Sequence, residues 1–172
     1  MIVVVPEDAL ENAQELLGAG FLFVSGGPTR QASVANGLEL VQRDRVVIHD
    51  GARPFVTTDL VTRVLDGLAD ADGAVAAIPV DDTVKRVEGD RVLHTVDRTQ
   101  LWQVQTPQAF WTGRLRIVHR RAEVDGIDAT DDAALIETFG GTVRVIEGSR
   151  TNIKLTHPED FAMAEHLAST LL

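Results

Sequence analysis

The stretch R-V-V-I-H-D-G-A-R-P-F-V, residues 45–56, decides how the rest of the chain is interpreted. Its three consecutive apolar residues, 46–48, predict a short strand buried on both faces, as in a parallel sheet. Ligands of open α/β sheets bind outside the carboxyl ends of such strands. Asp50 is therefore a candidate ligand for a divalent metal, and Arg53 is a candidate partner for a phosphate. A salt bridge at a strand end explains the same pair equally well.

Similar units lie on both sides of this stretch. Apolar, β-branched runs predict further buried strands at 1–5, 21–24 and 73–80, and apolar residues at helical spacing predict helices over about 6–17, 31–41 and 58–68. Thr58 is the expected cap of the last of these helices. Successive strand–helix units predict an α/β fold with a doubly wound, mostly parallel sheet. The length of 172 residues favours one domain.

The pattern changes after residue 80. Two short strands of mixed polarity, 83–87 and 91–97, flank Glu88-Gly89-Asp90 and predict a β-hairpin. An isolated hairpin is marginally stable in water, so this hairpin is expected to lie against a partner such as a second copy of the chain. A solvated surface hairpin is the alternative.

The bulk composition excludes several classes of protein. A net charge of −10 disfavours binding to nucleic acid or to an anionic membrane. The chain has no cysteine, which rules out disulfides, thiolate metal ligands and a cysteine nucleophile. No apolar run approaches the roughly 18 residues of a membrane span, and no basic region precedes the first apolar run. These features together predict a soluble, cytoplasmic protein.

Two further segments are candidates for a site. A glycine loop at 25–30 precedes a helix, which is the geometry that brings backbone N–H groups close to a ligand. Arg30 and Ser33 are placed to point into the same crevice. Asp131 and Asp132 follow Thr130 at a helix start, where acids either serve the helix dipole or form a metal site.

Six motifs, in order along nearly the whole chain, carry a resemblance to one family. They are G-G-P-T-R-Q-A-S-V (26–34), H-D-G-A-R-P-F (49–55), D-T-V-K (82–85), V-D-R-T-Q-L-W-Q-V-Q-T-P-Q-A-F (96–110), T-D-D-A (130–133) and N-I-K-L-T-x-P-E-D (152–160). The set resembles 2-C-methyl-D-erythritol 4-phosphate cytidylyltransferase, an enzyme family of non-mevalonate isoprenoid biosynthesis. The resemblance implies a Rossmann-like, three-layer α/β/α nucleotidyltransferase fold over 1–172, with a protruding β-hairpin arm at 81–103 that interlocks a homodimer.

The resemblance also implies a reaction. The family joins CTP to methylerythritol phosphate, with release of pyrophosphate and formation of a CDP-alcohol. The substrate phosphate is the nucleophile, so catalysis consists mostly of positioning and charge neutralisation. A magnesium ion (Mg²⁺) is the implied cofactor. By the same resemblance, Gly27 and Ser33 contact the nucleoside end of CTP, and Asp50 binds the metal or the substrate hydroxyls.

Five further residues receive substrate roles from the resemblance. Arg53 and Thr83 are expected to bind methylerythritol phosphate from the neighbouring subunit, and Arg98 to position its phosphate. Thr106 is expected to touch the substrate, and Lys154 to steer the attacking phosphate. Arg98 and Lys154 are thus the expected catalytic residues.

The chain departs from the family in one respect. The family opens with a strand and a loop of the form A-A-G-x-G-x-R, followed by P-K, which wraps the triphosphate; this sequence has neither. The expected consequences are a βα unit of roughly 30 residues missing before Met1, weak or absent turnover, and an exposed sheet edge. A ribitol 5-phosphate cytidylyltransferase and a non-catalytic dimer that binds a polyol phosphate are the alternative functions.

Overall fold

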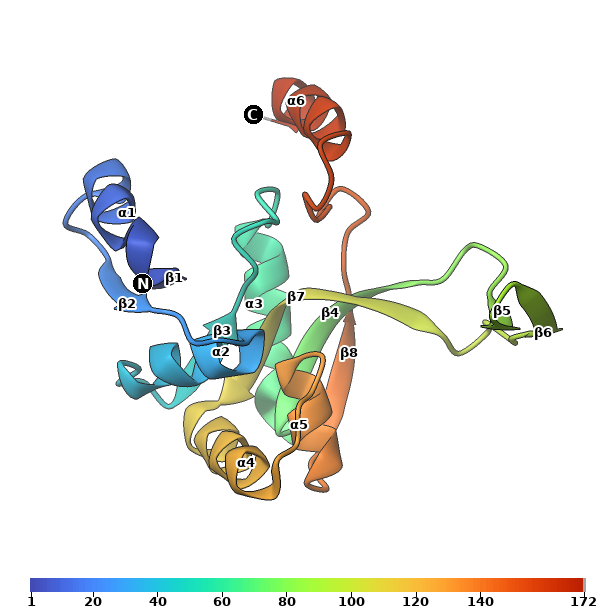
Figure 1. Ribbon diagram of the computed structural model, residues 1–172, viewed down its shortest axis with the longest axis horizontal. Coiled ribbons are helices and arrows are strands. Elements are labelled where there is room, and N and C mark those ends of the chain that lie inside the picture. Colours follow the sequence, from blue (N-terminus) through green and yellow to red (C-terminus); the bar gives the residue numbers. More distant parts are fainter. Residues whose placement is uncertain (172) are drawn as a thin grey trace.

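The computed structural model describes residues 1–171 and has an α/β architecture (Figure 1). Its strands are β1 (Ile2–Val5), β2 (Leu22–Ser25), β3 (Arg45–Ile48), β4 (Gly73–Pro79), β5 (Lys85–Glu88), β6 (Arg91–Thr95), β7 (Trp102–Trp111) and β8 (Val143–Glu147). Its α-helices are α1 (Leu10–Leu17), α2 (Arg30–Glu39), α3 (Thr58–Asp66), α4 (Thr112–Asp125), α5 (Asp132–Thr138) and α6 (Asp160–Leu171), and the 3-10 turns are η1 (Glu7–Ala9) and η2 (Gly67–Asp70).

The central sheet is mixed rather than parallel throughout. Its strand order is β3-β7-β4-β8, while β1 and β2 form a separate parallel pair. Strand β4 is parallel to β8, but β7 is antiparallel to both β3 and β4. The predicted α/β class is confirmed, and the parallel relation holds for β3, β4 and β8. Strand β7 is the exception, and it carries part of the site.

Strand β7 is a ten-residue strand that the sequence pattern did not reveal. It contains Pro107 and three glutamines, which are unusual in the middle of a sheet. Its pairing with β4 is interrupted between the pairs Val75–Gln108 and Ala77–Val104. Pro107 lies in this irregular stretch, so its missing N–H costs the ladder no hydrogen bond. The interruption places the polar side chains of residues 105–108 in the interior.

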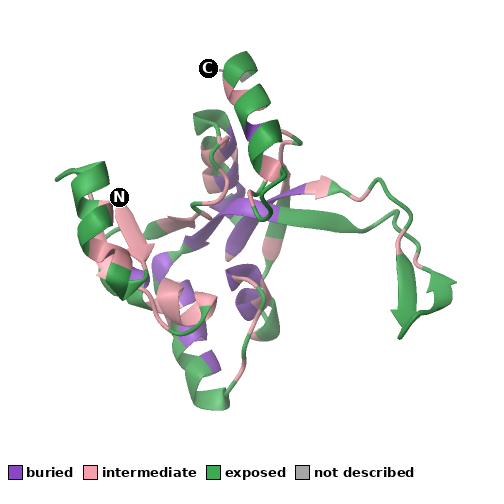
Figure 2. Ribbon diagram, turned by 45° about the horizontal axis from the view of Figure 1, so that its top comes forward, coloured by how far each residue is buried: buried purple, intermediate pink, exposed green. Residues whose placement is uncertain are grey.

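Two hydrophobic clusters cover the two faces of the central sheet, which makes the fold three-layered (Figure 2). Alternate residues of β4 and β7 point to opposite faces. Val75 and Phe110 pack with α2, α4 and α5 on one face, while Ala74 and Ala109 pack with α3 and η2 on the other. Full burial of a side chain such as Phe110 contributes roughly 2–3 kcal/mol relative to exposure.

Strands β1, β2 and β3 are less buried than predicted. Every residue of β1 is only partly buried, and β3 is exposed at Arg45 and partly buried beyond it. Strand β1 is paired only with β2, and β3 only with β7, so each has one strand neighbour. Leu16 of α1 remains 82% exposed. The prediction of complete burial is therefore correct for the first five residues of β4 and wrong for β1, β2 and β3.

The predicted hairpin is present as β5 and β6, which form their own two-stranded sheet away from the core (Figure 1). All nine of its strand residues are exposed, and Val87, Val92 and Leu93 are about half exposed. We call the hairpin and its two connections, residues 81–103, the arm.

One predicted cap is displaced by one residue. Thr57, not Thr58, accepts the hydrogen bond from Leu60 N at the start of α3. At the start of α6, Asp160 accepts from the backbone N–H groups of Thr156 and His157. No helix within residues 1–171 is long and apolar enough to cross a membrane.

Candidate functional site

A polar cleft of about 270 Å³ lies where β3 ends and β7 becomes irregular. It is lined by Arg30, Asp50, Arg53, Val104, Gln105, Thr106, Gln108, Thr130, Asp131 and Lys154. A larger surface hollow of about 600 Å³ lies beside Arg43, Asp44 and the first turn of α4, at the opposite end of β3. The smaller cleft is the candidate site because acid and basic side chains from distant segments converge in it.

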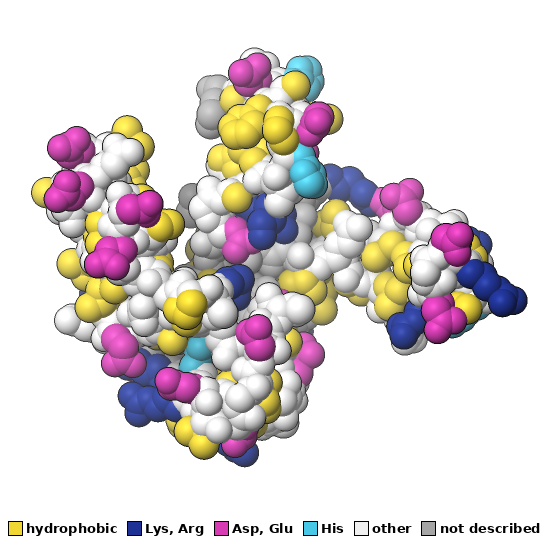
Figure 3. All heavy atoms as spheres, in the orientation of Figure 1, with side chains coloured by type: hydrophobic (Ala, Val, Ile, Leu, Met, Phe, Trp, Pro, Cys, Tyr) yellow, Lys and Arg dark blue, Asp and Glu magenta, His cyan; other side chains and the backbone are white. Residues whose placement is uncertain are grey.

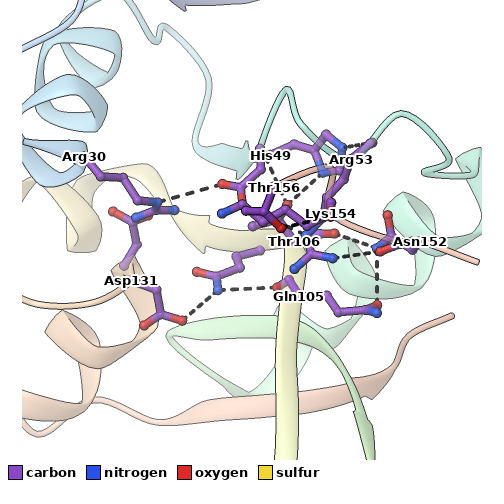
Figure 4. A network of polar contacts seen from close by, with 12 residues as sticks. Arg30, His49, Arg53, Gln105, Thr106, Asp131, Asn152, Lys154 and Thr156 are labelled. Atoms are coloured by element: carbon purple, nitrogen blue, oxygen red, sulfur yellow. Dashed lines mark hydrogen bonds and ion pairs between the residues drawn. The ribbon is translucent and has the colours of Figure 1, made fainter. Parts of the chain in front are cut away.

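Asp50 is the centre of this cleft. Three basic side chains from separate segments approach its carboxylate: Lys154 Nζ at 2.9 Å, Arg30 Nε at 3.9 Å and Arg53 Nε at 4.0 Å. Figure 4 shows the three bases converging. The lining therefore carries three cations against two carboxylates, Asp50 and Asp131, and this local positive excess suits a ligand with several anionic oxygens.

Arg53 is held inside its own chain's cleft. Its Nη1 donates to Asn152 O at 2.7 Å, and its side chain is only 13% exposed. Burial lowers the pKa of Arg53, and the charge of Asp50 opposes that shift. The structure places this partly buried side chain beside Asp50 of its own chain, which favours a role in that chain's cleft over the expected role in the neighbouring subunit's site.

Thr106 links the three residues that close this end of the cleft. Its Oγ1 accepts from Asp50 N at 3.0 Å and lies 3.1 Å from His49 Nδ1. His49 Nε2 lies 3.0 Å from Arg53 O. A carbonyl oxygen only accepts, so Nε2 carries the hydrogen, and in the neutral ring the Thr106 hydroxyl donates to Nδ1. His49 thus has a positioning role that sequence reasoning missed, because its partner Thr106 is 57 residues away.

Lys154 reaches the cleft because its segment is tied to two others. Leu155 N donates to Ala52 O at 2.8 Å, which joins the segment to the loop after β3. The buried Asn152 side chain donates to Thr106 O at 2.8 Å and to Gln105 Oε1 at 3.2 Å. The loop after β8 therefore lies along the irregular part of β7. This position directs the Lys154 side chain toward Asp50.

Gly27 and Ser33 meet each other next to the cleft rather than within its lining. Gly27 N donates to Ser33 Oγ at 3.0 Å, and Ser33 Oγ donates to Thr29 O at 2.8 Å. A Cβ at Gly27 would lie 2.5 Å from the Cβ of Ala32, so the tight approach of this loop to α2 requires glycine. Arg30, at the start of α2, does point into the cleft as expected (Figure 4).

Asp131 and Asp132 have separate structural roles. Asp131 Oδ1 caps α5 by accepting from Ala134 N at 2.9 Å, and its Oδ2 accepts from Gln108 Nε2 at 2.8 Å. Asp132 is 1% exposed and is bound to Arg30 and His119. The two carboxylates thus meet different partners, which supports the capping interpretation over a shared metal site.

The arm residues lie outside the cleft of their own chain. Arg98 Nη1 donates to Val80 O at 2.9 Å and also contacts Asp81 O, at the base of the arm. Thr83 precedes β5 and is exposed. Neither residue lines the cleft, so the structure brings together Asp50, Arg53, Thr106 and Lys154 but not Thr83 and Arg98.

The described residues contain no cluster of three or more His, Asp or Glu side chains that would hold a metal by themselves. Asp50 offers a single carboxylate. Magnesium is commonly bound by one or two carboxylates together with substrate phosphates and water. Asp50 therefore fits a magnesium ion that is shared with a bound nucleotide.

The three-layer α/β fold, with its cleft at the end of a sheet strand, is the Rossmann-like nucleotidyltransferase fold of solved cytidylyltransferase structures. Residues 1–169 match the family model for 2-C-methyl-D-erythritol 4-phosphate cytidylyltransferase. The chain belongs to this family, as the sequence motifs predicted.

Individual relatives agree with this assignment. A 2-C-methyl-D-erythritol 4-phosphate cytidylyltransferase of Bacillus velezensis is 45% identical over an alignment that covers 96% of this chain and 74% of the relative. The enzyme of the same name from Halalkalibacterium halodurans is 44% identical, over 96% of this chain and 75% of the relative. The crystal structure of the Thermus thermophilus enzyme superposes with a TM-score of 0.88 at 42% identity, over 98% of this chain and 81% of that one.

Proposed function

We propose that this chain transfers the cytidylyl group of CTP to 2-C-methyl-D-erythritol 4-phosphate, forming CDP-methylerythritol and pyrophosphate. Membership of the cytidylyltransferase family supports the reaction. The structural observation that supports the reaction at the level of residues is the cleft in which Lys154, Arg53 and Arg30 surround Asp50. Such a cleft suits a reaction between two phosphorylated substrates, because their mutual repulsion must be offset.

The proposed chemistry needs no nucleophile from the protein. An oxygen of the methylerythritol phosphate attacks the α-phosphorus of CTP, a new P–O bond forms, and the bond to the leaving pyrophosphate breaks with its electron pair. Lys154 and Arg53 hold the attacking phosphate in line. Lys154 is 44% exposed and Arg53 13%, so Lys154 is the more accessible of the two cations. Thr106 fixes the backbone of Asp50 and adds a polar contact at the closed end.

The nucleotide half of the proposed site is formed by the glycine loop and Asp50. Gly27 and Ser33 present a compact loop beside α2 for the nucleoside. Asp50 would contact the ribose hydroxyls or hold a magnesium ion. A bound ion would supply further neutralisation of phosphate charge, and Lys154 would then give up its contact with Asp50.

The remaining roles depend on a second chain. We propose a homodimer in which each arm reaches its partner, so that Thr83 and Arg98 complete the partner's site. The half-exposed valines and leucine of the hairpin would be covered in that dimer. The proposed location is the cytoplasm, where CTP is available.

The test is release of pyrophosphate from CTP and Mg²⁺ with a defined acceptor. We expect release with 2-C-methyl-D-erythritol 4-phosphate and at least a hundredfold lower kcat/KM with ribitol 5-phosphate. Preference for ribitol 5-phosphate would assign the other cytidylyltransferase activity. Binding of the polyol phosphate by calorimetry, with neither CTP binding nor pyrophosphate release, would instead show a non-catalytic binding protein.

A further inference from the structure

A buried ionic group lies directly behind the cleft. Asp132, the first residue of α5, is 1% exposed, and its two carboxylate oxygens have different partners. Oδ2 accepts from Arg30 Nη1 at 2.8 Å, and Oδ1 lies 2.9 Å from Nε2 of His119, which is 5% exposed. Arg30 and Asp132 are 102 residues apart and belong to α2 and α5. The contact therefore joins two helices across the edge of the cleft.

The Nε side of the Arg30 guanidinium is turned toward the cleft. Its Nε lies 3.9 Å from Asp50 Oδ1, and its side chain remains 36% exposed where it lines the cleft. In Figure 3, basic side chains are visible in the hollow below α6. A guanidinium is planar and presents its N–H groups in a fixed fork. Because Asp132 binds Nη1, it fixes the plane of the Arg30 guanidinium. The same contact therefore fixes the direction in which Nε points toward Asp50.

The cost of burying Asp132 indicates that this contact has a use beyond packing. An ionised carboxylate in an apolar interior is unfavourable unless it is paired. Burial raises the pKa of Asp132, but the hydrogen bond with His119 and the charge of Arg30 outweigh that effect and lower the pKa overall. His119 alone would satisfy one oxygen inside the core. The other oxygen is used instead to hold a cation at the cleft.

We propose that Arg30 is a positioning residue for Asp50, and that Asp132, supported by His119, is its anchor. The inference rests on the proposed function, in which Asp50 contacts the nucleotide. Arg30 lies only three residues after Gly27, which is assigned to the nucleoside end, so its effect is expected on CTP rather than on the polyol phosphate. A lysine at position 30 would keep one charge beside Asp132 but would lack the fork that reaches both acids.

The test compares Arg30→Lys, Asp132→Asn and the double variant with wild type. The control is Arg63→Lys, because Arg63 pairs with Asp59 at the same 2.8 Å on the exposed face of α3, outside the cleft. Steady-state pyrophosphate release gives kcat and the separate KM values for CTP and for the polyol phosphate. Thermal melting reports folding of each variant.

We expect Arg30→Lys and Asp132→Asn each to lower kcat/KM for CTP by about 10- to 100-fold, mainly through KM. The KM for the polyol phosphate should change less than threefold, and Arg63→Lys should match wild type. The double variant should be no worse than Arg30→Lys alone, because both changes act through one side chain. An Asp132→Asn protein that melts lower but keeps the wild-type KM for CTP would overturn the proposal, and so would additive losses in the double variant.

A spectroscopic measurement separates this proposal from the proposed function. In ¹H–¹⁵N spectra, the Nη1–H signal of Arg30, which donates to Asp132, should exchange slowly with solvent in wild type and rapidly in Asp132→Asn. If wild type releases no pyrophosphate from CTP, the proposed function fails for this chain while the anchoring is still tested. An Arg30 Nη1–H signal unchanged by Asp132→Asn would overturn the anchoring on its own.

Discussion

Lys154 Nζ lies 2.9 Å from the Asp50 carboxylate, and Lys154 is one of the three cations of the cleft. Removing the cation in Lys154→Met should lower kcat/KM by about a hundredfold or more, which is the usual effect of deleting a group that stabilises transition-state charge. Lys154→Arg keeps the charge and should recover part of the loss. Because the Lys154 side chain is 44% exposed, melting temperatures should stay close to wild type. Near-normal turnover of Lys154→Met would remove Lys154 from the mechanism.

Asp132 makes stability depend on pH. Burial acts to raise its folded-state pKa, but the partners His119 and Arg30 outweigh burial and lower that pKa overall. The ionised carboxylate therefore contributes full stability above its unfolded-state pKa of about 3.9, and this contribution is lost as the pH falls through the lower folded-state value. Calorimetric melts from pH 7 downward should show the melting temperature falling below about pH 4. Asp132→Asn should flatten this part of the profile, and an equally steep profile in that variant would contradict the assignment.

Much of the site was predictable residue by residue, and the part that was missed has a physical reason. Asp50 lies at the end of a predicted strand, and Lys154 lies in a family motif, so both could be assigned from local sequence. His49 and Asp132 act through partners 57 and 102 residues away. No local sequence pattern predicts such long-range contacts, because a histidine after a strand and an acid at a helix start are common in any α/β protein.

Among the elements, β7 contributes most to the site and was the hardest to predict. A strand is normally recognised by alternating polarity or by an apolar run, whereas β7 has Gln105, Thr106, Pro107 and Gln108 in its centre. Most of these polar groups find a partner across the irregular stretch: Gln105 with the loop after β8, and Gln108 Nε2 with Asp131. Gln108 Oε1 is buried without a hydrogen-bond partner among the described residues. The polar residues that made this strand hard to predict are therefore the residues that form the closed end of the cleft.

This role of β7 can be tested with Thr106→Val, which keeps the side-chain shape. The change leaves Asp50 N–H and His49 Nδ1 without their partner at a position that is 4% exposed. We expect a loss of about 1–3 kcal/mol in the free energy of unfolding, measured by urea denaturation. The matched control is Thr62→Val, since the Thr62 hydroxyl only donates to Thr58 O on the exposed face of α3. The free energy of unfolding of the control should stay within about 0.5 kcal/mol of wild type. Equal losses in both variants would show that the contacts of Thr106 with Asp50 and His49 do not add to stability.

The whole molecule has its core and its cleft on one side and the arm on the other. The arm contributes exposed apolar residues and two proposed substrate contacts, Thr83 and Arg98, that do not reach the cleft of the same chain. Arg53, in contrast, is fixed beside Asp50. If the proposed dimer exists, the residues of one site divide between two chains, with Asp50 and Arg53 on one side and Arg98 on the other.

Mixing inactive variants tests this division. In Asp50→Ala mixed with Arg98→Ala, random pairing makes half of the dimers mixed, and each mixed dimer has one intact site, so roughly a quarter of wild-type activity should return. Asp50→Ala mixed with Arg53→Ala should recover nothing, because each mixed dimer then has one damaged cleft of each kind. Activity is measured as pyrophosphate release after the chains are unfolded and refolded together. Recovery in both mixtures would place Arg53 in the partner's site after all, and recovery in neither would count against an arm that completes the site of a second chain.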